Sequence, residues 1–397
     1  MKICGIIAEY DPFHNGHAYH ISKTKAMGAD AVVVALGGQF TQRGDPAWCS
    51  KYLRAKCAVL NGADLVLEIP TPYAVGSAEK FAEGGMKVLS SLGCVDTLSF
   101  GSESGDVDLI QRFEKLEVSK EFTDLVKEEL KSGISVPVAR MKATEKLDKD
   151  ILKIMENPND LLAAEYIKFI DKENLNITPL AIKRFGAGHG EESSFKSGIS
   201  SASYLRSFDN PEDIIPYIPS NVSDLLNDAY QNGYLPTDMK KYETLVLSIL
   251  RTKTIEDIKK VPDAENEGFY NRIYDAIKKS RTLDELYDNI KTKRYTMTRV
   301  KRVVAGAVLG LDNERIKKIN IPYIRVLAMN EKGCDLLKMA SETSVLPVGT
   351  SLKELSEISK ETESMANIES LAEDLWQICR KTPGECGKAY TEKIKKI

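Results

Sequence analysis

Four short apolar segments, separated by helix-like segments, restrict the fold of this chain most strongly. They occupy residues 2–8, 31–36, 64–69 and 97–100. The second, AVVVAL, shows no polar alternation, which is typical of a parallel strand buried on both faces. Helical patterns follow the first three segments, at residues 18–27, 48–60 and 77–92. This repeated order predicts an α/β fold with a Rossmann-like, doubly wound parallel sheet.

The loop after the first strand concentrates unusual chemistry. It holds three of the four histidines of the chain: His14, His17 and His20. Ligands of doubly wound sheets bind beyond the C-terminal ends of the strands, so the loops after strands one, two and four are the predicted site walls. The helix that follows this loop begins with free backbone N–H groups, which suit a phosphate. The structural alternative is that these histidines only cap the helix and pack in the turn.

A second segment with phosphate-binding chemistry follows near residue 200. Ser200 and Ser201 precede a predicted helix, and Arg206 lies in the first turns of that helix. Hydroxyls, backbone N–H groups and a guanidinium together suit a phosphate ligand, although the serine pair could be a simple N-cap. Between the two segments, the glycine-rich residues 186–190 predict a mobile loop.

Beyond residue 210 the sequence changes character. Three prolines mark a boundary at residues 211–219, and the remainder is mainly helical with a short predicted strand at residues 323–328. We therefore expect two domains, a catalytic one at residues 1–210 and a mainly helical one at residues 211–397.

One stretch of the helical part is strongly basic. Because the net charge is −3, any nucleic-acid contact needs a local basic patch. Residues 291–302 contain no acidic residue, one aromatic residue and six basic ones: Lys291, Lys293, Arg294, Arg299, Lys301 and Arg302. This pattern fits an RNA-backbone contact, and a solvated basic helix start is the simpler alternative.

Cysteine usage and hydropathy indicate the compartment. The seven cysteines form no CxxC pair, which fits reduced thiols in a cytosolic protein. No segment approaches the roughly 20 apolar residues needed to span a bilayer, and the first residues do not resemble a signal peptide. We expect a cytoplasmic protein with no membrane partner.

The sequence contains neither a Walker lysine motif nor GxGxxG, so it supports neither a P-loop protein nor a dinucleotide oxidoreductase. The HxGH pattern of His14 to His17, with the later serine–arginine segment, resembles the nucleotidyltransferase superfamily. That resemblance implies attack on the α-phosphorus of ATP with pyrophosphate as leaving group. The histidines would then stabilise the charge that develops on the phosphates. Gly16, which lacks a Cβ, would let the nucleotide approach the backbone.

A narrower resemblance covers nearly the whole chain. The segments that carry it are EYDPFHNGHAYH, GGQFTQRGDPA, DLVLEIPTPYAV, FGSESGD, NPNDLL and KRYTMTRVKR. Together they resemble the bacterial tRNA(Met) cytidine acetate ligase family. The resemblance implies that acetate and ATP, the latter accompanied by Mg²⁺, form acetyl-adenylate. The acetyl group then passes to N4 of the wobble cytidine of elongator tRNA(Met).

The resemblance also implies site residues, each named here by its place in this sequence. The catalytic candidates are His14, His17 and Asp11, and a structural role for Asp11 at the turn is the alternative. No metal-ligating residues are predicted. The tRNA contacts would come from the six basic residues of 291–302. The predicted ATP-binding residues are Ile7, Ala8, Glu9, Tyr10, Phe13, Gly16, His20, Gly101, Asn159, Arg184, Ser200, Ser201 and Arg206. Asn157, in the same turn as Asn159, is the alternative to it.

Two other functions stay open from the sequence. One is a small-molecule adenylyltransferase that acts on a mononucleotide or on phosphopantetheine, although such an enzyme needs no basic helical domain. The other is a non-catalytic RNA-binding protein, which the intact histidines do not favour. Gln42 and Arg43, in the loop after the second strand, are candidates for orienting acetate or the base.

Overall fold

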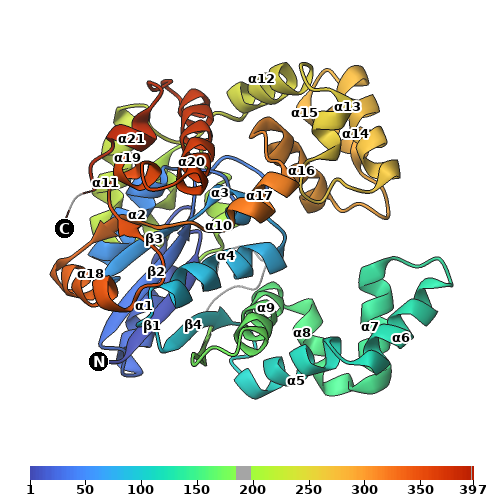
Figure 1. The fold of residues 1–397 in the computed structure, drawn as a ribbon, viewed down its shortest axis with the longest axis horizontal. Coiled ribbons are helices and arrows are strands. Elements are labelled where there is room, and N and C mark those ends of the chain that lie inside the picture. Colours follow the sequence, from blue (N-terminus) through green and yellow to red (C-terminus); the bar gives the residue numbers. More distant parts are fainter. Residues whose placement is uncertain (185–197, 395) are drawn as a thin grey trace.

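The computed structural model describes residues 1–184, 198–394 and 396–397, arranged around a seven-stranded sheet (Figure 1). The glycine-rich loop predicted at residues 186–190 lies outside the described residues. The strand order is β5-β4-β1-β2-β3-β6-β7. The strands are β1 (Ile3–Ala8), β2 (Ala31–Gly37), β3 (Leu65–Ile69), β4 (Thr97–Ser102), β5 (Thr178–Lys183), β6 (Ile324–Met329) and β7 (Val348–Gly349). The first five are mutually parallel, which confirms the predicted α/β sheet.

Helices cover both faces of this sheet. Successive residues of β2 alternate between the two layers, Val33 facing one and Val34 the other, because side chains alternate along a strand. One layer contains α4 (Ala78–Ser91) and α9 (Pro158–Lys172). The other contains α1 (Asn15–Ala26), α2 (Lys51–Leu60) and α11 (Ser220–Gln231). Both faces of β2 are therefore buried, as its apolar sequence predicts.

Two groups of helices project from this core (Figure 1). The first follows β4 and comprises α5 (Val107–Glu117), α6 (Lys120–Leu130), α7 (Val136–Leu147) and α8 (Leu152–Glu156). The second, called here the helical block, comprises α12 (Met239–Leu250), α13 (Ile255–Lys259), α14 (Glu267–Lys279), α15 (Leu283–Ile290), α16 (Met297–Val308) and α17 (Asn313–Ile319). The shorter helical elements are α3 (Thr71–Ala74), η1 (Lys149–Ile151), α10 (Ala202–Leu205) and η2 (Pro211–Tyr217).

The chain returns to the sheet after the helical block. Strand β6 pairs antiparallel with β3, and β7 pairs with β6. The last helices are α18 (Glu331–Thr343), α19 (Leu352–Ser356), α20 (Lys360–Cys379) and α21 (Lys388–Thr391). The sequence predicts a strand at residues 323–328, and β6 confirms it. The sequence does not predict that β6 pairs with β3, because the apolar pattern of a strand does not specify which sheet edge it joins.

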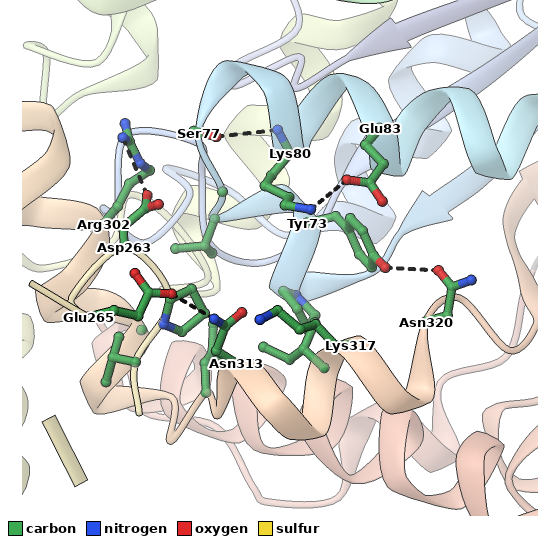
Figure 2. Close-up of a pocket in the computed structure, with 18 of the residues that line it drawn as sticks. Tyr73, Ser77, Lys80, Glu83, Asp263, Glu265, Arg302, Asn313, Lys317 and Asn320 are labelled. Carbon is green, nitrogen blue, oxygen red and sulfur yellow. Dashed lines mark hydrogen bonds and ion pairs between the residues drawn. The ribbon is translucent and has the colours of Figure 1, made fainter. Parts of the chain in front are cut away.

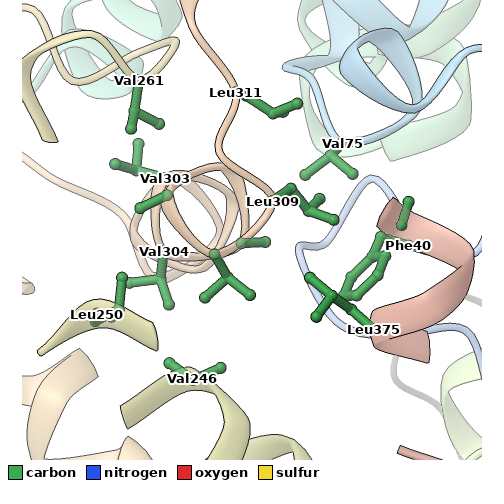
Figure 3. Packing of buried hydrophobic residues seen from close by; sticks show 14 of the residues in the cluster. Phe40, Val75, Val246, Leu250, Val261, Val303, Val304, Leu309, Leu311 and Leu375 are labelled. Carbon is green, nitrogen blue, oxygen red and sulfur yellow. The ribbon is translucent and has the colours of Figure 1, made fainter. Parts of the chain in front are cut away.

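The packing is continuous across the predicted boundary at residue 210. Around α16 a single apolar cluster joins Val304 of the helical block to Phe40 and Val75 of the N-terminal part and to Leu375 of α20 (Figure 3). Residues 211–231 also pack on the sheet layer that contains α2. The two sequence regions therefore share both a sheet and a core.

Five charged side chains are buried where these regions meet. Lys51 of α2 contacts Glu68 of β3, and the Nη1 atom of Arg325 in β6 lies 3.2 Å from the second oxygen of Glu68. The Lys51 ammonium also lies 3.8 Å from carboxylate oxygens of Glu369 and Glu373, both on α20. All five side chains are at most 2% exposed. This buried charge cluster joins elements that are far apart in the sequence.

Two further observations concern the chain as a whole. All seven cysteines are free thiols. Among the described residues, no helix has both the length and the apolar character needed to cross a bilayer.

Burial of Glu369 makes stability depend on pH. Burial, together with the adjacent Glu68, raises the pKa of the Glu369 carboxyl to about 8. Between the unfolded value of 4.5 and this folded value, the native state holds a proton that the unfolded chain releases. The free energy of unfolding should therefore fall with rising pH in this window, by up to about 1.4 kcal/mol per pH unit.

We predict that Glu369→Gln, which resembles the protonated acid, removes this part of the pH dependence. Urea unfolding between pH 5 and pH 8 should show the variant gaining stability relative to the parent as pH rises. Glu357→Gln, on an exposed carboxylate, is the matched control and should parallel the parent. A constant difference between Glu369→Gln and the parent across this range would contradict the assignment.

Candidate active site

A cavity of about 270 Å³ lies at the C-terminal ends of β1, β4 and β5, where a doubly wound sheet is expected to bind its ligand. Its walls also include the start of α1, the loop after β2, part of α9 and the segment around α10. Most of the residues predicted for catalysis and ATP binding line it: Ile7, Ala8, Glu9, Tyr10, Asp11, His14, Gly16, His17, His20, Gly101, Asn159, Arg184, Ser201 and Arg206.

Two predicted residues, Phe13 and Ser200, are not among the lining residues. Phe13 is buried, and its ring centroid lies 5.0 Å from that of Tyr10 and 5.6 Å from that of His17. It therefore supports the rings that face the cavity. Ser200 is buried as well, and its hydroxyl has no hydrogen-bond partner.

His14 and His17 cap the N-terminus of α1 reciprocally. The Nδ1 atom of His14 accepts a hydrogen bond from the Gly16 N–H at 3.0 Å, and Nδ1 of His17 accepts from the His14 N–H at 3.2 Å. The two rings stack with centroids 3.6 Å apart. Because each Nδ1 accepts a hydrogen bond, the proton of each neutral ring must be on Nε2. A role in capping α1 and a role in binding a ligand are therefore compatible, because capping leaves both Nε2–H groups as donors.

The electrostatic environment keeps these rings neutral. Burial, with a smaller contribution from Arg184, lowers the pKa of His14 to about 3 and that of His20 to about 4. Burial likewise lowers the pKa of His17, with the positive charges around it adding to the effect. Near neutral pH the cavity therefore offers uncharged imidazole donors. His20 differs from the other two because its Nε2 already lies 3.0 Å from the Ser99 hydroxyl.

Gly16 is needed to make room for the His14 ring as well as for a ligand. A Cβ at this position would lie 2.9 Å from the His14 ring and 3.5 Å from Ile199. Any larger residue would displace the ring that caps the helix. At Gly101 a Cβ would meet only the Arg184 side chain at 3.5 Å, an ordinary contact distance.

The contacts of Asp11 support its structural alternative. Its carboxylate is buried and accepts the backbone N–H of Trp48 at 2.8 and 3.1 Å and that of Cys49 at 3.4 Å. These bonds attach the turn after β1 to the segment that precedes α2. The guanidinium of Arg206 lies 4.0 Å from the same carboxylate and donates to the Asp11 carbonyl.

The two asparagines that compete as ATP-binding candidates lie in different places. Asn159 lines the cavity and donates to Glu103, whereas Asn157 is not among the lining residues and its amide lies 3.3 Å from Asp160. Asp160 in turn is buried and accepts the backbone N–H of Ser104 at 3.0 Å. The loop after β4 is thus fixed against the start of α9.

The serine–arginine segment forms one helical turn, α10, beside the histidine turn. Ser201 is its N-cap and accepts the Tyr204 N–H at 3.3 Å. The Asn15 amide donates to the Gly198 carbonyl at 2.8 Å, which joins the two segments. Ser201 and Arg206 thereby reach the same cavity as His14 and His17.

The cavity is also lined by residues that the sequence analysis did not assign to ATP, among them two cations. Within the described part of the chain, Arg43 and Lys183 join the predicted Arg184 and Arg206, so four cations surround the cavity. Lys183 is the last residue of β5, so the rule that ligands bind at strand ends could have identified it. Apolar and aromatic residues complete the wall, notably Phe81, Phe100, Leu162, Tyr166 and Ile182. In the sequence these residues are indistinguishable from core residues.

The residues that the structure describes contain no cluster of three or more His, Cys, Asp or Glu side chains arranged to hold a metal ion. In the cavity, the carboxylate of Asp11 is occupied by backbone N–H groups, and the Oε1 atom of Glu9 accepts the Gln42 N–H at 2.6 Å. Burial raises the pKa of Glu9, which disfavours its charged form.

The six basic residues predicted to bind RNA divide into two groups. Lys291, Lys293 and Arg294 are exposed, just before α16. The other three, on α16, contact the protein. The Arg299 guanidinium donates to the Asp263 carbonyl at 2.7 Å and lies over the Phe269 ring, Lys301 pairs with Asp45 at 3.0 Å, and Arg302 lies 3.8 Å from the Asp263 carboxylate.

Comparison with known proteins places this geometry in context. The sequence model of the HIGH Nucleotidyl Transferase family matches residues 1–389. A tRNA(Met) cytidine acetate ligase of Thermosipho africanus is 39% identical over 360 residues, which cover 88% of this chain and 85% of the relative. One from Clostridium tetani is 36% identical over 397 residues, with 96% of each chain covered. The similarity therefore includes the helical block.

Solved structures extend the comparison. A crystal structure of apo Thermotoga maritima TmcAL matches with a TM-score of 0.91 at 28% identity, and each chain is covered completely. A second crystal form, bound with alpha-thio ATP, matches with a TM-score of 0.90 at 27% identity and the same coverage. The two share the architecture of this chain from end to end.

We predict that Asp11→Ala lowers stability. Its removal would leave the buried Trp48 N–H without a partner, so the free energy of unfolding should fall by about 1–3 kcal/mol. Urea denaturation measures this change. Asp209→Ala, which removes an exposed carboxylate, is the matched control. An Asp11→Ala protein with unchanged stability but no activity would instead assign the residue to catalysis.

Proposed function

The chain belongs to the HIGH nucleotidyl transferases and, within them, to the tRNA(Met) cytidine acetate ligases, and we propose that it acetylates N4 of the wobble cytidine of elongator tRNA(Met). ATP and acetate would first form acetyl-adenylate. The observation that carries this proposal is the pair of stacked histidines whose Nδ1 atoms cap α1, because it leaves two neutral Nε2–H donors at a cavity lined by four cations.

In the first step, an acetate oxygen attacks the α-phosphorus of ATP, and pyrophosphate leaves with the electron pair of the broken P–O bond. His14 and His17 donate hydrogen bonds to the phosphate oxygens, where negative charge accumulates. Ser201, Arg206 and Arg184 approach from the other walls and bind the β- and γ-phosphates. Neutral histidines and fixed guanidiniums require little rearrangement as the charge develops.

In the second step, the cytidine N4 attacks the acetyl carbonyl, AMP leaves, and N4 loses a proton. The mixed anhydride hydrolyses readily, so its site must exclude water. Phe81, Phe100 and Tyr166 supply the apolar wall that this exclusion requires. We assign the orientation of acetate or the base to Arg43 and Gln42, in the loop after β2, because both line the cavity.

The metal ion would accompany the nucleotide. Because the described part of the chain offers no group of three metal-ligating side chains, we propose that Mg²⁺ enters bound to the triphosphate. The steps assigned above to the histidines and arginines do not depend on a protein-held metal.

RNA contact is assigned to the helical block, and ATP binding to residues 1–210. Lys291, Lys293 and Arg294 are exposed and free to pair with phosphates. Lys301 instead pairs with Asp45, and Arg302 is largely buried beside Asp263. Since Asp45 belongs to the same loop as Arg43, the helical block is attached directly to a wall of the catalytic cavity.

The direct test is to incubate the protein with ATP, radiolabelled acetate and elongator tRNA(Met). Label in N4-acetylcytidine is the expected result. Transfer of AMP to a mononucleotide or to phosphopantetheine, without labelled RNA, would identify a small-molecule adenylyltransferase instead. Binding of tRNA without any turnover of ATP would identify a non-catalytic RNA-binding protein.

We predict that His17→Asn abolishes adenylate formation but leaves the fold intact. The asparagine side chain can still accept the His14 N–H in place of Nδ1, but it has no group at the position of Nε2. Acetate-dependent ATP–pyrophosphate exchange should fall by about 10²–10³-fold, the usual cost of one charge-stabilising donor. Binding of tRNA should be unchanged.

The companion variant His17→Gln provides the contrast. Its longer amide reaches toward the position of Nε2 but cannot cap the helix in the same way. It should retain more exchange activity than His17→Asn while unfolding at lower urea concentration. Equal loss of exchange and of tRNA binding in both variants would show that His17 is only structural.

We predict that the exposed basic residues set the salt dependence of tRNA binding. The triple variant Lys291→Ala, Lys293→Ala and Arg294→Ala should bind tRNA more weakly. Its log–log salt slope should flatten by about two, from three lost phosphate contacts at roughly 0.7 each. Fluorescence anisotropy against salt concentration measures both quantities.

The control removes the same charge elsewhere. Lys332, Lys338 and Lys353 are exposed on the C-terminal helices α18 and α19, and their combined replacement by alanine should leave the slope unchanged. If both triple variants behave alike, the stretch before α16 is a solvated surface without a specific role in RNA binding.

A further inference from the structure

A second cavity, of about 440 Å³, lies between the sheet and the helical block (Figure 2). One wall comes from α3 and the first turns of α4. The other comes from the loop before α14 and from α16 and α17. Its volume falls within the roughly 300–1,000 Å³ that is typical of small-ligand sites. None of the predicted ATP-binding residues lines this cavity, and Arg302 is the only predicted RNA-binding residue that does.

The interior of this cavity is apolar and its edge is polar. Val75, Val261 and Leu311 are buried and form the apolar part. Figure 2 shows charged and amide side chains from both walls around the opening, among them Lys80, Glu265, Asn313 and Lys317. A flat group with polar edges and an attached anion, such as a nucleotide, matches this distribution.

Arg302 is the strongest indication of an anionic ligand. Its side chain is only 13% exposed, and its buried Nε has no hydrogen-bond partner. Its nearest carboxylate oxygen, on Asp263, is 3.8 Å away, beyond hydrogen-bond distance. A buried guanidinium N–H is costly to leave without an acceptor. A phosphate oxygen in the cavity would supply that acceptor.

Lysines on both walls can bind the same anion. Lys80 and Lys317 are 57% and 64% exposed, and each pairs only with an acid three residues away in its own helix. Such exposed pairs contribute little to stability, so the ammonium groups can turn to a ligand. Lys87 lies between Glu83 and Asn320, at 2.7 and 2.9 Å.

Four cations and three carboxylates line the cavity: Lys80, Lys87, Arg302 and Lys317, and Glu83, Asp263 and Glu265. With Glu314, which pairs with Lys317 at 3.1 Å but is not a lining residue, the two signs are equal in number. A single phosphodiester, with one negative charge, disturbs this balance less than a triphosphate. The carboxylates suit the exocyclic amino group of a base, because Glu and Asp accept hydrogen bonds from such groups. Glu265 is already held in place by the Asn313 amide at 2.6 Å.

The position of the cavity connects it to the catalytic site. Consecutive residues of the first turns of α4 line the two cavities: Lys80 lines the second, and Phe81 lines the catalytic one. A strand of RNA whose target base enters the catalytic cavity can therefore extend across α4 toward the second cavity. Single-stranded loops, whose bases can be splayed outward, are the usual targets of sequence-specific RNA recognition.

From these observations we propose that the second cavity binds one unpaired nucleotide of the RNA substrate, close to the cytidine that is modified. Arg302, Lys80 and Lys317 bind its phosphodiester, and Glu265 and Asp263 read an amino group of its base. This inference rests on the proposed function, because it assumes an RNA substrate. It supplies that function with a recognition site that the catalytic cavity lacks.

The test uses two kinds of variant of the full chain. Lys80→Ala with Lys317→Ala removes phosphate contacts, and Asn313→Trp fills the base-binding part. Anisotropy with labelled elongator tRNA(Met) should show roughly tenfold weaker binding for each. The lysine variant should also flatten the salt slope by about one, whereas Asn313→Trp should leave the slope unchanged. Acetate-dependent ATP–pyrophosphate exchange without RNA should stay at the parental level in both.

Matched controls separate this effect from general changes of the surface. Lys338→Ala with Lys388→Ala removes two lysines that also pair with acids three residues away. Ser341→Trp adds the same bulk on the exposed face of α18. Parental tRNA affinity in the cavity variants would overturn the inference, as would equal weakening in the controls.

The outcomes also distinguish this inference from the proposed function. If the parent labels tRNA and the cavity variants bind it normally, only the recognition site is wrong. If the parent binds tRNA through this cavity but never acetylates it, the recognition site is right and the proposed reaction is wrong.

Discussion

The structure depends on the buried charge cluster of Lys51, Glu68, Arg325, Glu369 and Glu373. Taking these five side chains out of water is unfavourable unless each charge finds a partner and Glu369 keeps its proton, and removal of one partner of such a pair typically costs about 3–5 kcal/mol. The partners here come from α2, β3, β6 and α20. The cluster is complete only when the C-terminal region has docked on the sheet. The N-terminal sheet and the C-terminal helices therefore stabilise each other.

This requirement extends to the catalytic cavity through the loop after β2. Gln39 donates to Glu373 at 2.7 Å and accepts the Lys51 N–H at 3.0 Å, so the buried cluster fixes the start of the loop. The buried Arg54 guanidinium donates to the carbonyls of Glu9, Gly37 and Gly38, which ties this loop to the turn after β1. Arg43 is thus presented by a loop that is fixed at both ends. A preformed wall of this kind suits a reaction whose catalysis depends on aligning charges.

Much of the fold and the histidine site followed from local patterns, and the rest depends on tertiary contacts. The continuous apolar run of β2 predicts burial on both faces, and HxGH at a strand end predicts the cap and the donors. By contrast, Glu68 lies in an apolar strand and Lys51 at the start of a helix, and neither position reveals a buried ion pair. The pairing of β6 with β3, and the aromatic wall of Tyr166 and Phe100, similarly depend on neighbours that are distant in the sequence.

The basic stretch at residues 291–302 shows why counting charges is insufficient to locate an RNA-binding surface. Of its six cations, those on α16 contact Asp263, Phe269 and Asp45, and the free ones precede the helix. Helical periodicity alone cannot separate the two groups, because their partners come from other elements. The same structure brings Lys80 and Lys317, which are isolated in the sequence, to one cavity beside Arg302. What matters for an anion is which cations keep unmet hydrogen-bond donors after folding, and the buried Nε of Arg302 meets that criterion.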